Sequence, residues 1–165
     1  MSLSSPLITP CLWFDNEGEE AAKFYTSIFP DSEILSVSHY TEAGHETHGQ
    51  PAGKVLTVDF KISNTPFVAL NGGPQSKFTE AVSFQVDCKD QAEVDYYWGK
   101  LLEGGGTESE CGWLKDKFGL SWQIVPVQLK EWLSGEDKEG AKRAMEAMMK
   151  MVKMDITRLK EAFER

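Results

Sequence analysis

The sequence predicts an α+β protein built from two βαβββ repeats, followed by an added amphipathic helix. The first observation is a repeat in which a strand, an acidic turn and an aromatic-bearing helix occur twice. Asp15 and Asp87 are 72 positions apart, and so are Phe24 and Tyr96. The second observation is a β-hairpin signature at the end of the second repeat. The third is an apolar stripe of helical period near the C-terminal end.

The first repeat covers about residues 5–75. Asp15-Asn16 is a helix-start signal, and Pro30-Asp31 ends the same helix. Between these signals, apolar residues recur at the spacing of one helix face. The polar segment Glu42–Gly53 is expected to be a loop. The elements expected in order are a strand over Leu7–Phe14, a helix over Glu17–Phe29, and strands over Glu33–Thr41, Lys54–Ile62 and Pro66–Asn71.

The second repeat covers about residues 80–126 and follows the same order. It begins with a strand over Ala81–Asp87 and a helix over Gln91–Leu102. It ends with a hairpin whose strands are Trp113–Lys115 and Leu120–Val125. The turn between these strands ends in a glycine, a residue that adopts positive φ at little cost. The sheets of the two repeats are expected to curl around a shared concavity.

Residues 127–165 are predicted to be a helical extension of the domain formed by residues 1–126. A short helix is expected over Gln128–Leu133, and the following Ser134–Asp137 resembles a capping box. Apolar residues then recur at steps of three or four, which predicts one helix over residues 137–164. Because a lone helix needs burial to be stable, we expect its stripe to pack on protein, across a homodimer. The stripe consists of Ala141, Met145, Met148, Val152, Ile156, Leu159 and Phe163.

Charge and composition exclude several classes of partner. The net charge is −9, and residues 1–126 hold 18 acidic against 8 basic side chains. All three arginines lie in the extension, so the repeats lack the residue that most often binds phosphate. We therefore expect no nucleic-acid partner. No apolar run reaches membrane-span length, and the three cysteines favour a reducing, cytoplasmic location without a membrane partner.

A family resemblance is carried by three segments, Glu19–Tyr25, Leu70–Pro74 and Cys111–Pro126. They resemble the PhnB-like, or demethylubiquinone methyltransferase-like, branch of the vicinal oxygen chelate (VOC) superfamily. This superfamily includes glyoxalases, bleomycin resistance proteins and dihydroxybiphenyl dioxygenases. The resemblance covers roughly the first 126 residues. It implies the glyoxalase (VOC) fold, a homodimer, and a ligand cavity between the repeats.

In metal-dependent members of that superfamily, four ligands come from the first and last strands of each repeat. The resemblance puts Thr9, Ala69, Ala81 and Gln123 at those places. Alanine has no donor atom and threonine is a poor ligand, so we expect no metal and no other cofactor. The one His/Glu cluster of the sequence, His45–His48, is interpreted as a solvated polar loop because nothing nearby fixes a ligand geometry.

The period-2 rule for strands points to a set of candidate ligand-binding residues on the concave side. They would form an aromatic pocket with a few neutral polar groups, suited to a small apolar or aromatic molecule. Cys11 has no evident activating neighbour, so a structural thiol is favoured over a nucleophile. The candidates are Cys11, Trp13, Asn71, Ser83, Trp113 and Gln123, with Trp122 near them or in the core.

Two alternatives stay open. One is a VOC-type enzyme, a lyase, isomerase, dioxygenase or methyltransferase, that uses Gln123, Asn71 and Cys11 or a weakly bound metal. The other is a non-catalytic interaction module that acts through the C-terminal helix. The methyltransferase name lacks support in the sequence, since neither Gly72-Gly73 nor Gly104–Gly106 joins a strand to a helix as nucleotide loops do.

Overall fold

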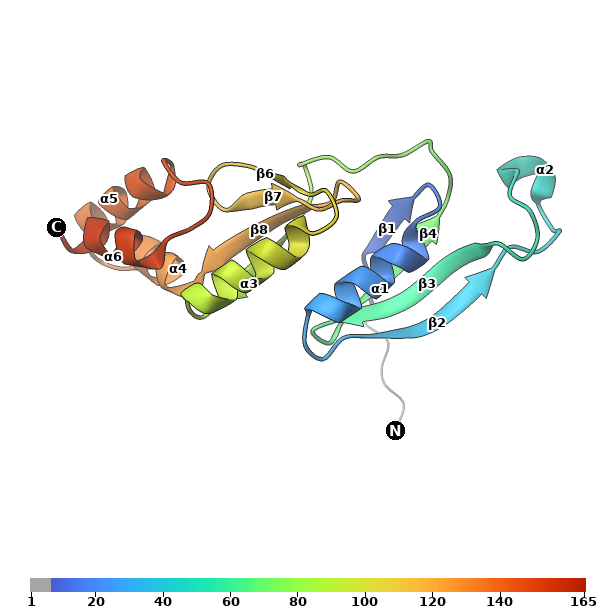
Figure 1. The fold of residues 1–165 in the computed structure, drawn as a ribbon, viewed down its shortest axis with the longest axis horizontal. Helices are drawn as coiled ribbons and strands as arrows, with labels where there is room; N and C mark the ends of the chain where they lie inside the picture. The colour runs from blue at the N-terminus through green and yellow to red at the C-terminus, as the bar shows by residue number, and fades with distance from the viewer. Residues whose placement is uncertain (1–6) are drawn as a thin grey trace. The chain divides into compact units, whose positions relative to one another are not determined.

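The computed structural model of the protein describes residues 7–165. It contains two four-stranded sheets in two compact units, of which the first ends at Lys77 and the second runs from Phe78 to Arg165 (Figure 1). The sheets have the strand orders β1-β4-β3-β2 and β5-β8-β7-β6. The two orders are the same when the strands of each unit are counted from its start, so the predicted pair of βαβββ repeats is confirmed.

In the first unit, β1 and β4 are parallel, and β4, β3 and β2 are antiparallel neighbours. The loop between β3 and β4 has only Ser63 and Asn64, both with positive φ, as a two-residue hairpin with right-handed twist requires. The segment expected to be a plain loop contains one short helix, α2. The elements are β1 (Cys11–Phe14), α1 (Gly18–Ile28), β2 (Glu33–His39), α2 (His45–His48), β3 (Val55–Ile62) and β4 (Thr65–Asn71).

In the second unit, β5 and β8 are parallel, and β8, β7 and β6 are antiparallel neighbours. The hairpin of β7 and β8 turns at Gly119, whose φ is +86°, as the sequence predicted. The elements are β5 (Ser83–Cys88), α3 (Gln91–Leu102), β6 (Thr107–Glu108), β7 (Trp113–Lys115), β8 (Ser121–Pro126), α4 (Val127–Ser134), α5 (Lys138–Met148) and α6 (Ile156–Glu164).

Each unit has its own core between one helix and one face of its sheet. In the first, Tyr25 of α1 is fully buried and stacks on Phe60 of β3, with ring centroids 6.3 Å apart. In the second, the buried residues Val94 and Leu101 of α3 share a core with the strands. The alternation of buried and exposed residues along the strands follows from this one-sided packing.

The prediction of one long helix over residues 137–164 is wrong. The structure has two helices, α5 and α6, which pack on each other, and the chain between them leaves helical geometry. One long-range contact and one local cap account for the break. The carbonyl groups of Met151 and Val152 accept hydrogen bonds from the amides of Cys111 and Gly112, each at 2.8 Å. Asp155 then caps α6 by accepting from the Arg158 amide.

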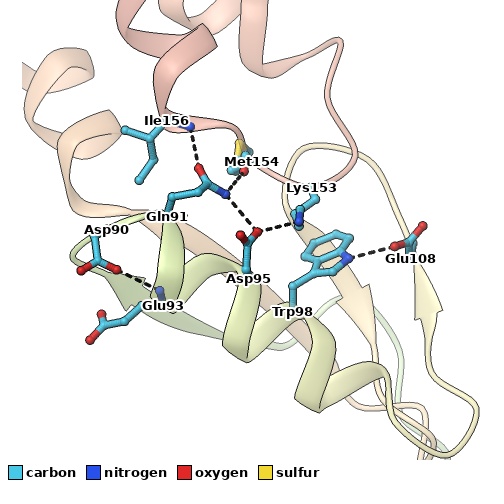
Figure 2. A network of polar contacts seen from close by, with 9 residues as sticks. All are labelled: Asp90, Gln91, Glu93, Asp95, Trp98, Glu108, Lys153, Met154 and Ile156. Atoms are coloured by element: carbon cyan, nitrogen blue, oxygen red, sulfur yellow. Dashed lines mark hydrogen bonds and ion pairs between the residues drawn. The ribbon is translucent and has the colours of Figure 1, made fainter.

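The segment between α5 and α6 joins the helical extension to α3 through side chains (Figure 2). The Gln91 side chain accepts from the Ile156 amide at 2.9 Å and donates to the Met154 carbonyl at 3.1 Å. Lys153 pairs with Asp95 at 2.6 Å. Met154 itself is only 1% exposed. Met151, Met154 and Leu159 are thus buried within their own unit, whereas Met145 and Val152 of the predicted stripe are exposed. The predicted packing of the stripe across a homodimer is untested.

Candidate functional site

Each sheet has one face that its helix does not cover, and we call these the α1-distal and the α3-distal face. Strand register assigns residues to them, because paired residues of neighbouring strands point to the same side. Cys11 pairs with Val68 and Trp13 with Leu70, which defines the α1-distal face. The α3-distal face is defined by the register of β5, β7 and β8, and it contains Ser83, Gln85, Trp113, Lys115, Ser121 and Gln123.

On the α1-distal face, Trp13 is fixed by the glycine pair that follows β4. Its indole Nε1 donates to the Gly73 carbonyl at 2.8 Å. A Cβ atom on Gly72 would lie 2.3 Å from the Trp13 ring, so only glycine fits there. The Gly72-Gly73 pair, which belongs to the Leu70–Pro74 segment of the family resemblance, therefore holds the Trp13 ring in position. Cys11, two residues earlier, lies on the same face and is exposed.

Asn71 lies on the opposite side from the one that the sequence indicated. It pairs with Phe14, and its side chain is buried beneath the start of α1 at 2% exposure. Its Oδ1 accepts from the Gly18 amide at 2.8 Å, and its Nδ2 donates to the Val55 carbonyl at 3.2 Å. The expected orientation is wrong because a shift of one residue along a strand reverses the face.

On the α3-distal face, three of the candidate residues come together. Gln123 Nε2 donates to Ser83 Oγ at 2.9 Å across the parallel pair β5 and β8. Trp113 is the antiparallel neighbour of Gln123 on β7. An indole ring thus lies beside a serine–glutamine pair, all on one sheet face.

A cavity of about 180 Å³ opens beside Trp113. Ser121 lines it and is only 1% exposed, and its hydroxyl has no hydrogen-bond partner within residues 7–165. Sequence reasoning missed this residue, although Ser121 is two positions before Gln123 and so shares its face. The other lining residues are Glu80, Thr107, Glu108, Ser109, Leu114 and Lys115.

Charged groups near the cavity are paired. Glu80 and Lys115 form an ion pair, and hydrogen bonding from Lys115 lowers the pKa of Glu80. Farther along the face, burial acts to raise the pKa of Asp87, but hydrogen bonds from Lys130 and Gln85 outweigh it and lower that pKa. Both carboxylates therefore stay ionised near neutral pH and offer no proton for acid catalysis.

The thiols lack the environment of a nucleophile. Partial desolvation by neighbouring residues raises the pKa of Cys11, and burial together with the nearby Glu93 raises the pKa of Cys88 to about 12. A thiol with a raised pKa has little of the reactive thiolate form at neutral pH.

The residues present do not fit the superfamily's metal site. Ala69 lies on the α1 side of its sheet, and its neighbours Val68 and Leu70 on the α1-distal face also lack donor atoms. Within residues 7–165, no three His, Cys, Asp or Glu side chains gather to hold an ion. His45 and His48 lie on the exposed helix α2. The absence of a metal in the protein itself stays a prediction.

The glycine segments do not fit a methyl-donor nucleotide either. The first is covered by the Trp13 indole, and in the second a Cβ on Gly106 would lie 2.8 Å from the Leu102 Cα and Lys115 carbonyl oxygen. Gly72 and Gly106 thus pack against protein, whereas a nucleotide loop leaves its backbone open to phosphate. Within the described residues, none of the helices is long and apolar enough to cross a membrane.

Comparison with known proteins gives the following similarities. A family model described as 3-demethylubiquinone-9 3-methyltransferase matches residues 6–125. A PhnB protein from Bacillus cereus, assigned by name to the same methyltransferases, is 33% identical over 73% of this chain and 99% of that chain, with a TM-score of 0.64. No curated protein matched the chain.

Two more distant structures share the fold alone. The protein PA1353 from Pseudomonas aeruginosa is 19% identical over 74% of this chain and 98% of that chain, with a TM-score of 0.52. The fosfomycin resistance protein FosX from Listeria monocytogenes is 17% identical over 81% of this chain and 100% of that chain, with a TM-score of 0.53. Helices α4, α5 and α6 follow the region matched by the family model.

Proposed function

The chain belongs to the 3-demethylubiquinone-9 3-methyltransferase family, the PhnB-like branch of the VOC superfamily, and from this membership we propose that it binds a small, largely apolar or aromatic molecule. The binding site is the cavity beside Trp113 on the α3-distal face. The observation that carries the proposal is the Ser121 hydroxyl, buried at the cavity without a partner. A buried hydroxyl without a partner costs about 1–3 kcal/mol, which a ligand with one polar group would recover.

The size and lining of the cavity support a ring-sized ligand. Its volume of about 180 Å³ is close to that of apolar cavities that hold benzene, about 150 Å³. Trp113 supplies an aromatic wall, and such walls favour stacked or edge-to-face rings. Glu80 and Lys115 neutralise each other, and the remaining carboxylate of the lining, Glu108, accepts from the Trp98 indole at 2.8 Å. The lining thus has no positive excess that would attract an anionic ligand. A neutral ring with one hydroxyl or carbonyl group therefore fits best.

Two observations weigh against catalysis by the residues considered from the sequence. Asn71 uses its side chain to hold the start of α1, and the pKa of Cys11 is raised. Transfer of a methyl group would also need a nucleotide site that the glycine segments do not provide. We therefore propose a binding protein that uses neither a metal nor S-adenosylmethionine.

The test compares phenol with benzene by isothermal titration calorimetry. We expect Ser121→Ala to weaken phenol binding about three- to tenfold, the value of one net hydrogen bond of about 0.5–1.5 kcal/mol. Benzene binding should not change. The control is Ser83→Ala, which removes a hydroxyl from the same face but outside the cavity lining. Since Ser121→Ala removes an unpartnered polar group, the variant should fold at least as stably as the natural chain.

Two results would overturn the proposal. One is the lack of saturable binding of either probe at millimolar concentration. The other is an equal loss of phenol binding in both serine variants. Native mass spectrometry of the purified protein adds an independent check, because a retained neutral aromatic molecule would identify the natural ligand.

We also propose a homodimer, as the family resemblance suggests. Large apolar side chains exposed on the described chain, such as Leu35 and Val82, give it surfaces that a second copy would cover. Light scattering should then give twice the chain mass of 18.5 kDa. A monomer mass at micromolar concentration would contradict this.

A further inference from the structure

We propose that the groove between α5 and α6 binds a small organic oxyanion, a molecule that carries a phosphate or a pair of carboxylates. The groove has a volume of about 360 Å³, which lies in the range of small-molecule sites of about 300–1,000 Å³. It shares no lining residue with the cavity beside Ser121. The charged side chains that line it are Arg143, Lys150, Arg158, Arg165, Glu146 and Glu161.

The distribution of arginine is the first argument. The chain has three arginines, and all three line this one groove. Arginine differs from lysine in its planar fork of N–H donors, which matches the oxygens of carboxylates and phosphates. A surface that only needed positive charge for solubility would not require this residue, and the rest of the chain uses lysine throughout.

One arginine is already held in place. Arg143 Nε donates to the Ala162 carbonyl at 3.0 Å, and its Nη2 donates to the Phe163 carbonyl at 2.7 Å. These bonds cap the last turn of α6 and fix the plane of the guanidinium group. The Nη1 donors are not used by these two bonds. A fixed donor loses little side-chain entropy when it meets a ligand.

In the part of the chain that the structure describes, two of the other three cationic side chains form no ion pair. Within residues 7–165, the side chains of Lys150 and Arg158 form no ion pair with a carboxylate, although Glu146 and Glu161 line the same groove. The lining thus has four cationic and two anionic side chains, an excess of two positive charges.

The net charge of −9 does not cancel this local excess. At physiological salt, the field of surface charges is screened beyond about 8 Å. An anion within the groove therefore responds chiefly to the side chains that line it. The groove walls also include Ala147, Met151 and Ala162, which favours an organic ion with an apolar body over a hydrated inorganic ion.

The two helices that form the groove pack on each other, and Arg143 of α5 binds the last carbonyl groups of α6. Asp137 caps α5 and Asp155 caps α6. Trp132 of α4 stacks on Phe163 of α6 at 5.4 Å. The turn between the helices is held at Gln91 (Figure 2). The arginines are therefore presented from a preorganised frame, which reduces the entropy cost of binding.

The experiment titrates the full chain with inorganic phosphate and with succinate at low salt by calorimetry. We expect saturable binding of at least one probe with a Kd of about 1 mM or below, and the tighter probe identifies the type of oxyanion. Arg158→Gln and Lys150→Gln should each weaken binding at least fivefold. Lys142→Gln on α5 and Lys160→Gln on α6 remove the same charge outside the groove lining and should change the Kd less than twofold. Glu146→Gln should tighten binding.

Equal loss of affinity in the groove and control variants would overturn the proposal, because it would show a general charge effect. So would no saturable binding of either probe up to 10 mM, or binding of a hexaglutamate peptide with no binding of the small anions. Thermal unfolding of each variant confirms that the chain is folded.

Discussion

The third strand of each unit shows how the two repeats differ. Strand β3 has eight residues, whereas β7, in the same place of the second sheet, has three. The difference begins at Cys111 and Gly112, which have φ values of 58° and 78° and leave the strand geometry. Their amides bond to Met151 and Val152 of the helical extension. In the first sheet, β3 pairs along its length with β2 and β4. In the second, the residues just before β7 bond instead to the segment between α5 and α6.

The helices of the two units begin differently as well. Helix α1 has no side-chain cap of its own, and Asn71 at the end of β4 binds its first amide instead. Helix α3 is capped locally by Asp90, which accepts from the Glu93 amide at 2.9 Å (Figure 2). This local cap leaves the next residue, Gln91, available to hold the extension. The comparison indicates that the second unit depends on residues 135–165 for its stability.

The largest expected effect is that of deleting residues 135–165. The deletion removes Met151, Met154 and Leu159, all buried, and each contributes about 1.5–3 kcal/mol when fully buried. We expect the second unit to lose about 5 kcal/mol or more of unfolding free energy. Hydrogen exchange measured by mass spectrometry should show lost protection in α3 and β8, with little change in α1 and β3. Unchanged protection in α3 would contradict the proposed dependence.

The second prediction concerns the first unit. Asn71→Ala leaves the Gly18 amide and the Val55 carbonyl without the partners that they have in the structure. Since each buried unpaired group costs about 1–3 kcal/mol, we expect a loss of about 2–4 kcal/mol. Urea unfolding followed by exchange at α1 measures it. Asn16→Ala, at an exposed position just before the helix, is the control and should cost less than about 0.5 kcal/mol.

These two predictions also show what the sequence could and could not establish. The strand–turn–helix order of each repeat and the hairpin turn at Gly119 are local patterns, and both were confirmed. The side that Asn71 faces depends on a register of one residue, which strand periodicity alone did not resolve. The contact of Gly72 with the Trp13 ring joins residues about 60 positions apart in the sequence. No local pattern could have predicted it.

The break between α5 and α6 was missed for a similar reason. The apolar steps of three and four continue through the break, so the period favoured one helix. What ends α5 is a competition between helical hydrogen bonds and the bonds from Cys111 and Gly112, about 40 residues earlier in the chain. One local signal was present, since Asp155 followed by Ile156 is a possible helix start. For Ser121, strand periodicity could have predicted the sheet face on which the residue lies. It could not have predicted that the buried hydroxyl has no hydrogen-bond partner within residues 7–165.

The third prediction separates the two roles at the start of α3. Gln91→Ala removes the acceptor for the Ile156 amide and the donor for the Met154 carbonyl, and should cost about 1–2 kcal/mol. Asp90→Ala removes only the helix cap, and should cost about 1 kcal/mol. Hydrogen exchange at single-residue resolution distinguishes them. The Ile156 amide should lose protection in Gln91→Ala alone, and the Glu93 amide in Asp90→Ala alone. Loss of protection at both amides in both variants would contradict the prediction. It would show that the Asp90 cap and the Gln91 bonds to the extension depend on each other.

The smallest expected effect is electrostatic and concerns the ion pair that also joins the extension to α3. The hydrogen bond from Lys153 lowers the pKa of Asp95 from its ordinary value of 3.8 (Figure 2). The pKa of Asp95 is thus lower in the folded chain than in the unfolded chain. At a pH above the unfolded pKa, the ion pair makes its full contribution to stability, and this contribution is lost as the pH falls through the folded pKa. Both side chains are about half exposed, at 43% and 50%, so solvent screening limits the gain to about 0.2–1 kcal/mol.

A double-mutant cycle of Asp95→Asn and Lys153→Gln measures that coupling directly from urea unfolding. At pH 7 the coupling should be favourable and should shrink in 1 M NaCl, where charges are screened beyond about 3 Å. At pH 2 it should fall toward zero as Asp95 takes up its proton. A coupling of the same size at both pH values would mean that the two side chains act through packing. The attachment of the extension would then rest on Gln91 and the backbone bonds to Cys111 and Gly112 alone, with no contribution from charge.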